Sequence, residues 1–451
     1  MEEARITDAI NYYNDLLVNK HLTSTQEVLS KTLKEQTPSS SLNRQEVCRV
    51  LRPFFVDKNK YQSIKQAALL VTRAITCLTK QVVKDASLRK ELALSPLEES
   101  VLEVGLNIES PNIISRFDGF LSETGKPSFI EYNIGALGGY GNSYILSEIF
   151  SNMPIIKDFS KRYPIETIPF IDTFSKEMLE AYHKWGGKGL PNIAVINSSK
   201  TLPLNLFHFL ALENCKVKVA QPKELEFRNG RLFIADFPVD LIYIDMVLWD
   251  FLTKIGLKHP ITKAVNQKVV CPFYWLQIII LSRKSIFALL SDEKYTNLFE
   301  KEVAQALVNY IPWTRKVCES KTIYQGKTID LIPFIANHRQ DFVLKPSFEY
   351  GGKGVIIGKD TDDNTWSETL KTALNGSYSY IVQEYITPTK DTYPTLTNGE
   401  LQFEDYLVDF NPYIWNLEKA DCFMVRLSKQ SILNTSTGWG SLTPPFIIST
   451  K

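Results

Sequence analysis

Four polar residues on two neighbouring segments have the types and spacing of a site for a cation and a phosphate. Arg116 and Asp118 lie two residues apart in one β-rich segment, and Glu131 and Asn133 lie two apart in the next. Because side chains alternate faces along a strand, the members of each pair share a face. If the segments pair as a hairpin, two carboxylates, a carboxamide and a guanidinium project from one patch.

The turn sequence SETGKPS between the two segments predicts that hairpin. A regular turn centred between Thr124 and Gly125 puts Asp118 opposite Glu131. Opposed carboxylates repel each other unless a cation lies between them. Mg²⁺ is the natural candidate, since it takes hard oxygen ligands from carboxylates and an amide oxygen can complete the set. The guanidinium is then free to bind a phosphate or a carboxylate in a fork geometry.

A hairpin whose polar face is simply solvated, with Arg116 neutralising its neighbours, is the structural alternative. The glycine-rich segment IGALGGYGNSY, residues 134–144, follows the hairpin directly. Glycine lets the backbone approach a ligand closely, and a plain structural hairpin has little use for it. This segment therefore favours a ligand site.

A second candidate site lies in DFVLKPSFEYGGKGVIIGKD, residues 341–360, where an apolar strand ends at Lys345 and a glycine-rich loop leads into another strand. The loop is no P-loop, because a P-loop leads into a helix. Its backbone N–H groups can cover nucleotide phosphates while lysines supply charge, although a flexible surface hairpin has the same sequence pattern. The loop residues are Gly351, Gly352, Lys353 and Gly354.

Two further segments carry polar residues within strand-like sequence. The strand-like segment SYIVQEYI carries Gln383 and Glu384, and it can offer backbone groups to an adenine edge and a carboxylate to a ribose. Taken alone, this segment is more simply an ordinary core strand. Asp409 and Asn411 form another acidic-x-Asn pair and compete with the hairpin for the metal. The hairpin is preferred because it has a second carboxylate. Arg426, further along, is expected to face the same cleft, as is Asn434.

The elements that must position these residues divide the chain into four parts. Apolar residues recur at three- and four-residue spacing through residues 1–105, which predicts a helical N-terminal region. Residues 106–160 hold the hairpin. Residues 161–265 alternate helices with apolar strands, which predicts a small open α/β domain with a partly parallel sheet. Residues 266–451 begin with a helix that ends near Pro312 and continue as strands and loops. The predicted fold class is α/β (α+β).

The composition is that of an ordinary globular protein and excludes several classes of function. The 51 basic residues balance 50 acidic ones, so nucleic acid is not expected as a partner. No apolar run reaches the roughly 18 residues of a membrane span, and the N-terminus lacks the pattern of a secretory signal, so a cytoplasmic protein is expected. The six cysteines and five histidines show no metal-ligand spacing or nucleophile motif. The 12% aromatic content is compatible with a homodimer without requiring one.

Together these motifs resemble the ATP-grasp superfamily, specifically its circularly permuted members such as glutathionylspermidine synthase. The resemblance rests on R-F-D at Arg116, E-Y-N at Glu131, K-P before the glycine-rich loop at Lys345, and Q-E at Gln383. It extends from about residue 110 to the end of the chain and implies an ATP-grasp fold with a small pre-ATP-grasp domain. Where those synthases continue with D-T-P-T, this chain has I-G-A-L-G-G, so glutathione and spermidine are not supported as substrates.

The resemblance also implies roles for individual residues. Asp118, Glu131 and Asn133 take the places of the Mg²⁺ ligands, and Arg116 takes the place of a residue that steadies the transferred phosphoryl group. Arg426, which is expected to face the same cleft, is the second candidate catalytic arginine. The implied ATP-binding residues are Lys284, Lys345, Gly351, Gly352, Lys353, Gly354, Gln383 and Glu384. Lys284 lacks the asparagine that usually precedes the second nucleotide-binding lysine.

The implied activity is that of an ATP-dependent carboxylate-amine ligase. A small-molecule or peptide carboxylate attacks ATP to give an acyl phosphate, and an amine then forms an amide with release of ADP and phosphate. A phosphotransferase using the same cleft and a non-catalytic nucleotide-binding homologue are the alternatives. The sequence identifies neither substrate.

Overall fold

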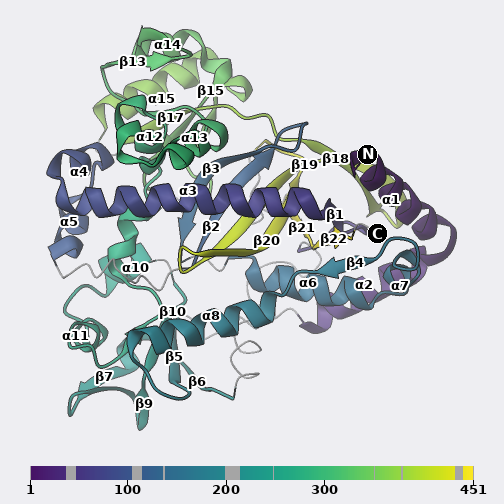
Figure 1. The fold of residues 1–451 in the computed structure, drawn as a ribbon, viewed down its shortest axis with the longest axis horizontal. Coiled ribbons are helices and arrows are strands. Elements are labelled where there is room, and N and C mark those ends of the chain that lie inside the picture. The colour runs from purple at the N-terminus through teal and green to yellow at the C-terminus, as the bar shows by residue number, and fades with distance from the viewer. Residues whose placement is uncertain are drawn as a thin grey trace.

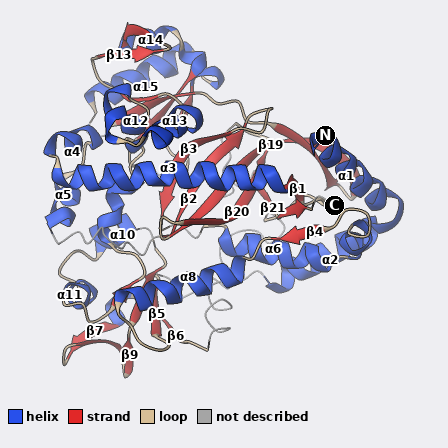
Figure 2. Cartoon of the chain, viewed as in Figure 1, coloured by secondary structure: helices blue, strands red, loops and turns tan. Residues whose placement is uncertain are grey.

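The computed structural model shows a mixed α/β protein in which helices separate several β-sheets (Figure 1). The structure describes residues 2–36, 47–103, 114–135, 138–198, 214–246, 248–349, 351–376, 379–431 and 440–449. Within these ranges, no helix combines the length and the apolar character needed to cross a lipid bilayer. Figure 2 shows that the strands gather into separate groups, with helices lying between and outside them.

The largest sheet contains the predicted hairpin at one edge. Its strands follow the order β21, β20, β19, β2, β3, and β18 also pairs with β19. All neighbouring strands are antiparallel. The strands are β2 (Ile114–Leu121), β3 (Pro127–Ile134), β18 (Lys390–Thr397), β19 (Glu400–Trp415), β20 (Lys419–Ser428) and β21 (Gly440–Thr443). The hairpin is therefore joined to strands from the far end of the chain.

One face of the large sheet packs on the long helix α3 (Lys58–Lys84), which crosses the sheet in Figure 1. The Tyr61 ring lies 5.2 Å from that of Phe423, which in turn lies 4.1 Å from Phe410. The helix begins at Asp57, whose side chain accepts a hydrogen bond from a backbone N–H of the first turn.

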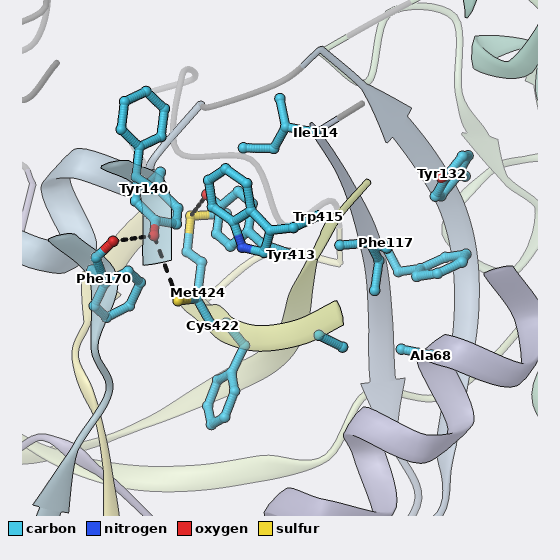
Figure 3. Packing of buried hydrophobic residues seen from close by; sticks show 14 of the residues in the cluster. Ala68, Ile114, Phe117, Tyr132, Tyr140, Phe170, Tyr413, Trp415, Cys422 and Met424 are labelled. Atoms are coloured by element: carbon cyan, nitrogen blue, oxygen red, sulfur yellow. Dashed lines mark hydrogen bonds between the residues drawn. The ribbon is translucent and has the colours of Figure 1, made fainter. Parts of the chain in front are cut away.

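The other face packs on α6 (Tyr140–Asn152). The Tyr140 ring meets Tyr413 and Trp415 edge-on, with centroids 4.9 and 5.4 Å apart, as Figure 3 shows. Because side chains alternate along a strand, Asp409 points to the same side as Tyr413. This is the face of the sheet that carries the candidate site.

A second antiparallel sheet carries the glycine-rich loop. Its order is β12, β17, β15, β16. The strands are β12 (Thr314–Lys316), β15 (Phe342–Pro346), β16 (Ile356–Ile357) and β17 (Tyr380–Glu384). Helices α14 (Leu331–Asn337) and α15 (Asp363–Asn375) and the hairpin of β13 (Lys321–Tyr324) and β14 (Lys327–Asp330) accompany it. Trp366 of α15 donates from Nε1 to the carbonyl of Ile335 in α14 at 3.1 Å, which ties the two helices together.

A four-stranded sheet with nearby helices lies mostly within residues 161–265, where a small α/β unit was expected. Its four strands run parallel in the order β11, β10, β5, β6. They are β5 (Asn192–Ile196), β6 (Lys216–Ala220), β10 (Leu241–Ile244) and β11 (Cys271–Pro272), with α8 (Phe170–Trp185), α10 (Leu248–Lys254) and α11 (Pro260–Asn266) nearby. The strand β11 lies beyond the expected boundary at residue 265. A separate antiparallel sheet adjoins these parallel strands; it consists of β7 (Leu225–Arg228), β8 (Arg231–Ile234) and β9 (Phe237–Val239). The helix expected at NLFHFLALEN lies outside the described residues except for Asn214.

The N-terminal region, which was expected to be helical, contains one strand in addition to its helices. The helices are α1 (Glu2–Leu16), α2 (Leu22–Gln36), α3, α4 (Ala86–Leu92) and α5 (Pro96–Glu103), with the π-helix η1 (Leu17–His21) between the first two. Between α2 and α3, β1 (Phe54–Asp57) pairs in parallel with β22 (Pro445–Ile448). β22 also pairs with β4 (Ile165–Thr167), close to α7 (Pro154–Phe159). A strand of four residues shows no clear period, and its partner lies at the other end of the sequence.

The single helix expected to end near Pro312 is also wrong, because the chain forms a series of shorter helices. They are η3 (Leu276–Ser282), α12 (Ile286–Leu290), η4 (Glu293–Leu298) and α13 (Lys301–Tyr310). The Asp292 side chain accepts from the backbone N–H of Lys294 at 3.1 Å. Local bonds of this kind start a new helix rather than continue an old one.

Candidate active site

The hairpin brings the four predicted residues together. Arg116 pairs with Asn133 and Asp118 with Glu131 in the register of β2 and β3, which confirms the predicted geometry. All four residues line one cavity. Their roles as ligands and catalytic groups remain predictions.

A β-bulge lies directly beside these pairs. Beyond Asp118 the register shifts by one residue, so that Gly119 faces Phe129 and Ile130 is the extra residue. The prediction of a regular hairpin is therefore wrong between the site and the turn. A Cβ atom on Gly119 would lie only 2.7 Å from the carbonyl oxygen of Ser128, so the bulge depends on glycine.

Asp118 is held by two guanidinium groups. Arg116 donates from Nε to Oδ1 at 2.7 Å and from Nη2 to Oδ2 at 3.2 Å, and Arg426 donates from Nη2 to Oδ2 at 2.9 Å. Burial acts to raise the pKa of Asp118, but the two guanidinium charges outweigh it and lower the pKa to about 2. Arg116, which was expected to bind a phosphate or a carboxylate in a fork geometry, thus binds a carboxylate in this structure, and its Nη1 also donates to Gly138 O at 2.8 Å. Its binding of a phosphate stays a prediction.

Arg426 links Asp118 to a second buried acid. Its Nε donates to Asp409 Oδ2 at 2.7 Å, and Asn411 donates from Nδ2 to Asp409 Oδ1 at 2.6 Å. Burial raises the pKa of Asp409, and Arg426 offsets part of that rise. Because β19 lies beside β2, Asp409 lines the same cavity as the hairpin. The two candidate metal sites therefore adjoin in one cavity, and the preference for the hairpin as the metal site stays a prediction. Asn434 lies outside the described residues.

Lys345 enters the cavity from the second sheet. Its Nζ donates to Gln383 Oε1 at 2.6 Å and to the carbonyl of Ile130 in the hairpin at 3.3 Å. The Gln383 amide is oriented by its second bond, from Nε2 to Thr314 Oγ1 at 3.0 Å. Burial of the Lys345 ammonium lowers its pKa to about 8. The two sheets therefore meet at this lysine.

Lys284 reaches the hairpin from the segment between η3 and α12. Its Nζ lies 2.9 Å from Glu131 Oε1 and also donates to the backbone carbonyl of Glu349. Its backbone N–H donates to Ser347 O at 2.9 Å. Lys284 therefore joins the hairpin to the base of the glycine-rich loop.

The hairpin residues line a cavity of about 340 Å³ between the large sheet and the second sheet, together with Asp409, Arg426, Lys345 and Gln383. Lys284 lies outside this lining and reaches the site through its ion pair with Glu131. Gly351 and Gly352 of the loop line it, whereas Lys353 and Gly354 are exposed and lie outside its lining. The apolar part of the wall is formed by Phe120, Val343, Val355, Ile357, Ile386 and Pro388. Glu384 also lines the cavity and accepts from Tyr324 OH at 3.1 Å.

The donor set fits the Mg²⁺ site that was predicted. Asp118, Glu131 and Asn133 supply the carboxylate and amide oxygens that Mg²⁺ prefers. The Nδ2 atom of Asn133 is buried without a hydrogen-bond partner in the described part of the chain. A half-turn of this amide puts its oxygen at the same place. Among the described residues no three His, Cys, Asp or Glu side chains form a metal site, so the set depends on the asparagine.

Residues at the end of the cavity next to α6 were not singled out from the sequence as site residues. Gly138, Gly139 and Asn142 line it at the start of α6, within the glycine-rich segment noted as a whole. Tyr413 donates from its hydroxyl to Gly138 O at 2.8 Å, the carbonyl that also accepts from Arg116. The alternation of side chains from Asp409 along its strand would have placed Tyr413 on this face.

Comparisons with known proteins give one sequence relative and one structure of similar fold. No family model matches the chain. Over 280 residues, 59% of this chain, it is 24% identical to a protein of Frankia casuarinae described as a candidate glutamate-cysteine ligase 2-2. That match spans 30% of the relative's length.

Among solved structures, the chain is similar to a glutathione synthetase-like effector, GSS30, from Globodera pallida. The TM-score is 0.59 at 13% identity, covering 95% of this chain and 97% of that one. A candidate γ-glutamylcysteine synthetase from Methylobacillus flagellatus covers 83% of this chain and 88% of its own at 11% identity, and its TM-score of 0.41 carries no argument. The chain thus has a mixed α/β fold similar to that of the effector along nearly its whole length.

Proposed function

We propose that this protein is an ATP-dependent carboxylate-amine ligase with a circularly permuted ATP-grasp fold. The observation that carries the proposal is one cavity lined both by Asp118, Glu131 and Asn133 of the hairpin and by Lys345 and Gln383 of the second sheet. Oxygen ligands opposite lysines suit a nucleotide whose phosphates bind a divalent cation. The hairpin precedes the glycine-rich loop in the sequence, as in the permuted family. The name of the Frankia relative and the effector-like fold support an amide product.

The apolar wall around Val343, Ile357 and Ile386 suits an adenine base. Lys345 and Lys284 then bind the phosphates, covered by the loop at Gly351 and Gly352. Mg²⁺, when held by the hairpin, supplies charge neutralisation between the phosphate oxygens.

The reaction proceeds by two displacements. A carboxylate oxygen of the first substrate attacks the γ-phosphorus of ATP, and ADP leaves with the electrons of the broken bond. The amine of the second substrate then attacks the acyl carbon, phosphate leaves, and the nitrogen loses a proton to complete the amide. Arg116 and Arg426 stabilise the negative charge on the transferred group. Both share Asp118 in the ligand-free structure, so a bound anion competes with that carboxylate.

The test is ADP release in the presence of Mg²⁺, measured for pairs of amino-acid or γ-glutamyl carboxylates and amines. We expect ADP release only when both substrates are present. A stable phosphorylated product formed without amine would indicate a phosphotransferase instead. Absence of both ADP release and nucleotide binding would overturn the proposal.

Replacing Glu131 by Gln should lower ADP release by at least about 100-fold, because residues that only orient metal ligands already contribute roughly 10–100-fold and loss of a ligand should cost more. The fold should survive, since the Gln amide oxygen can still accept a hydrogen bond from Lys284 and the Glu131 side chain is 26% exposed. Glu123→Gln, in the exposed turn of the same hairpin, is the matched control and should behave as wild type. Unchanged turnover of the Glu131 variant would contradict the metal assignment.

A further inference from the structure

A buried ion pair lies directly behind Lys284. Arg283 donates from Nε to Glu98 Oε1 at 2.7 Å and from Nη2 to Glu98 Oε2. The Glu98 side chain is fully buried, and that of Arg283 is 7% exposed. Glu98 belongs to helix α5 of the N-terminal region, for which the proposed reaction gives no role.

Glu98 is itself held in place by a capping box at the start of α5. Its Oε2 accepts from the backbone N–H and the hydroxyl of Ser95, both at 2.7 Å. Ser95 Oγ in turn accepts from the Glu98 N–H at 3.3 Å. The carboxylate that binds Arg283 is therefore a fixed anchor.

Arg283 and Lys284 lie between η3 and α12, where the backbone directs one side chain to Glu98 and the other to the site. Arg283 is extended, with φ −71° and ψ 127°. Successive side chains on an extended backbone point to opposite sides. Because Arg283 points to α5, Lys284 points the other way, to Glu131. On the following residue, Ser285 Oγ donates to Leu92 O of α4 at 3.0 Å.

Arg283 also contacts the base of the glycine-rich loop. Its guanidinium carbon lies 4.8 Å from the centre of the Phe348 ring, and that ring lies 4.3 Å from Trp249 of α10. Helices α5 and α10, which lie near each other in Figure 1, both pack on η3. The pair thus joins the N-terminal helices, the loop base and the small α/β unit immediately behind one nucleotide-binding lysine.

We infer that Glu98 is a positioning residue, which acts through Arg283 to direct Lys284 at the phosphates of the bound nucleotide. The inference rests on the proposed function. It assigns to the N-terminal helices α4 and α5 the task of supporting the nucleotide site from behind.

The test is a double-mutant cycle on nucleotide affinity, using calorimetric titration of the full chain with ATP and Mg²⁺. Glu98→Gln and Lys284→Met should each raise Kd about tenfold, within the range of coupling between residues of one network. The double variant should bind no more weakly than Lys284→Met alone, because Glu98 acts only through that lysine. Glu99→Gln, an exposed position on the same helix, should leave Kd unchanged.

A purely structural role predicts a different result. In that case Glu98→Gln lowers the melting temperature but leaves Kd at the wild-type value, or its effect on Kd adds to that of Lys284→Met; either result overturns the inference. If Glu98→Gln does not fold, Arg283→Lys keeps the charge but not the two-point geometry and should still raise Kd severalfold. If the wild-type protein binds no nucleotide, the proposed function is overturned as well. If Glu98→Gln and Arg283→Lys both bind ATP with the wild-type Kd, only the positioning role is overturned.

Discussion

Opposite charges alternate along the cavity wall, from Arg116 through Asp118 and Arg426 to Asp409. All four side chains are largely removed from water, so each charge depends on its neighbours for compensation. Asp118, with a pKa of about 2, remains ionised under ordinary assay conditions. If an anion binds as proposed, it meets guanidinium groups that their carboxylate partners already hold in place.

Arg426→Met should lower the free energy of unfolding by about 3–5 kcal/mol, because two buried carboxylates lose the guanidinium they share. Arg426→Lys should recover only part of this loss, since an ammonium cannot bond Asp118 and Asp409 with the same fork. Urea unfolding provides the measurement. Arg231→Met breaks an exposed pair with Asp240 and should cost less than about 1 kcal/mol. Equal costs at the two positions would show that the wall contributes no special stability.

Among the elements, the β2/β3 hairpin sets the distances within the site, and its bulge sets the register. Gly119→Ala would bring a Cβ within 2.7 Å of Ser128 O, so the backbone beside Asp118 must move. We expect a loss of about 1–3 kcal/mol in unfolding free energy. Mg²⁺-dependent ADP release should fall by more than this loss of stability alone explains.

Gly399→Ala is the control for the bulge. Gly399 lies in the turn between β18 and β19 at φ +85°, with open space around its Cβ position. The Gly399→Ala substitution should lower the free energy of unfolding by about 1–2 kcal/mol through backbone strain alone and leave ADP release unchanged. If both alanine variants lose activity in proportion to their stability, the bulge has no separate role in the site.

Elements whose partners are close in sequence could be predicted, and those with distant partners could not. The pairing of Asp118 with Glu131 followed from a turn signal and the alternation of side chains. The position of Asp409 depended on β19 lying beside β2, a contact between opposite ends of the chain that no local pattern encodes. The same holds for β1 with β22 and for Glu98 with Arg283. The bulge was missed because a single glycine in a strand does not specify its register.

At the scale of the whole molecule, the buried apolar side chains of the described residues form two clusters. The larger extends through the N-terminal helices, the large sheet and the small α/β unit. The smaller belongs to the second sheet and its helices, around Phe342, Leu344 and Trp366. Around the cavity the two parts meet through polar contacts such as Lys345 with Ile130 O and Lys284 with Glu131. We therefore expect the second sheet to open separately from the rest of the described chain.

Hydrogen exchange should reveal this division. Amides of β15 and β17 are expected to exchange through an opening of lower free energy than those of β2 and β19, because a small core provides less cooperative stability. ATP with Mg²⁺ should slow exchange in β15 and β17, since the nucleotide contacts both sides of the cavity and closes it, while β5 should change little. Mg²⁺ alone is the control and should protect the hairpin without protecting β15. Uniform exchange of all these strands, with or without nucleotide, would mean that the two cores open as one unit.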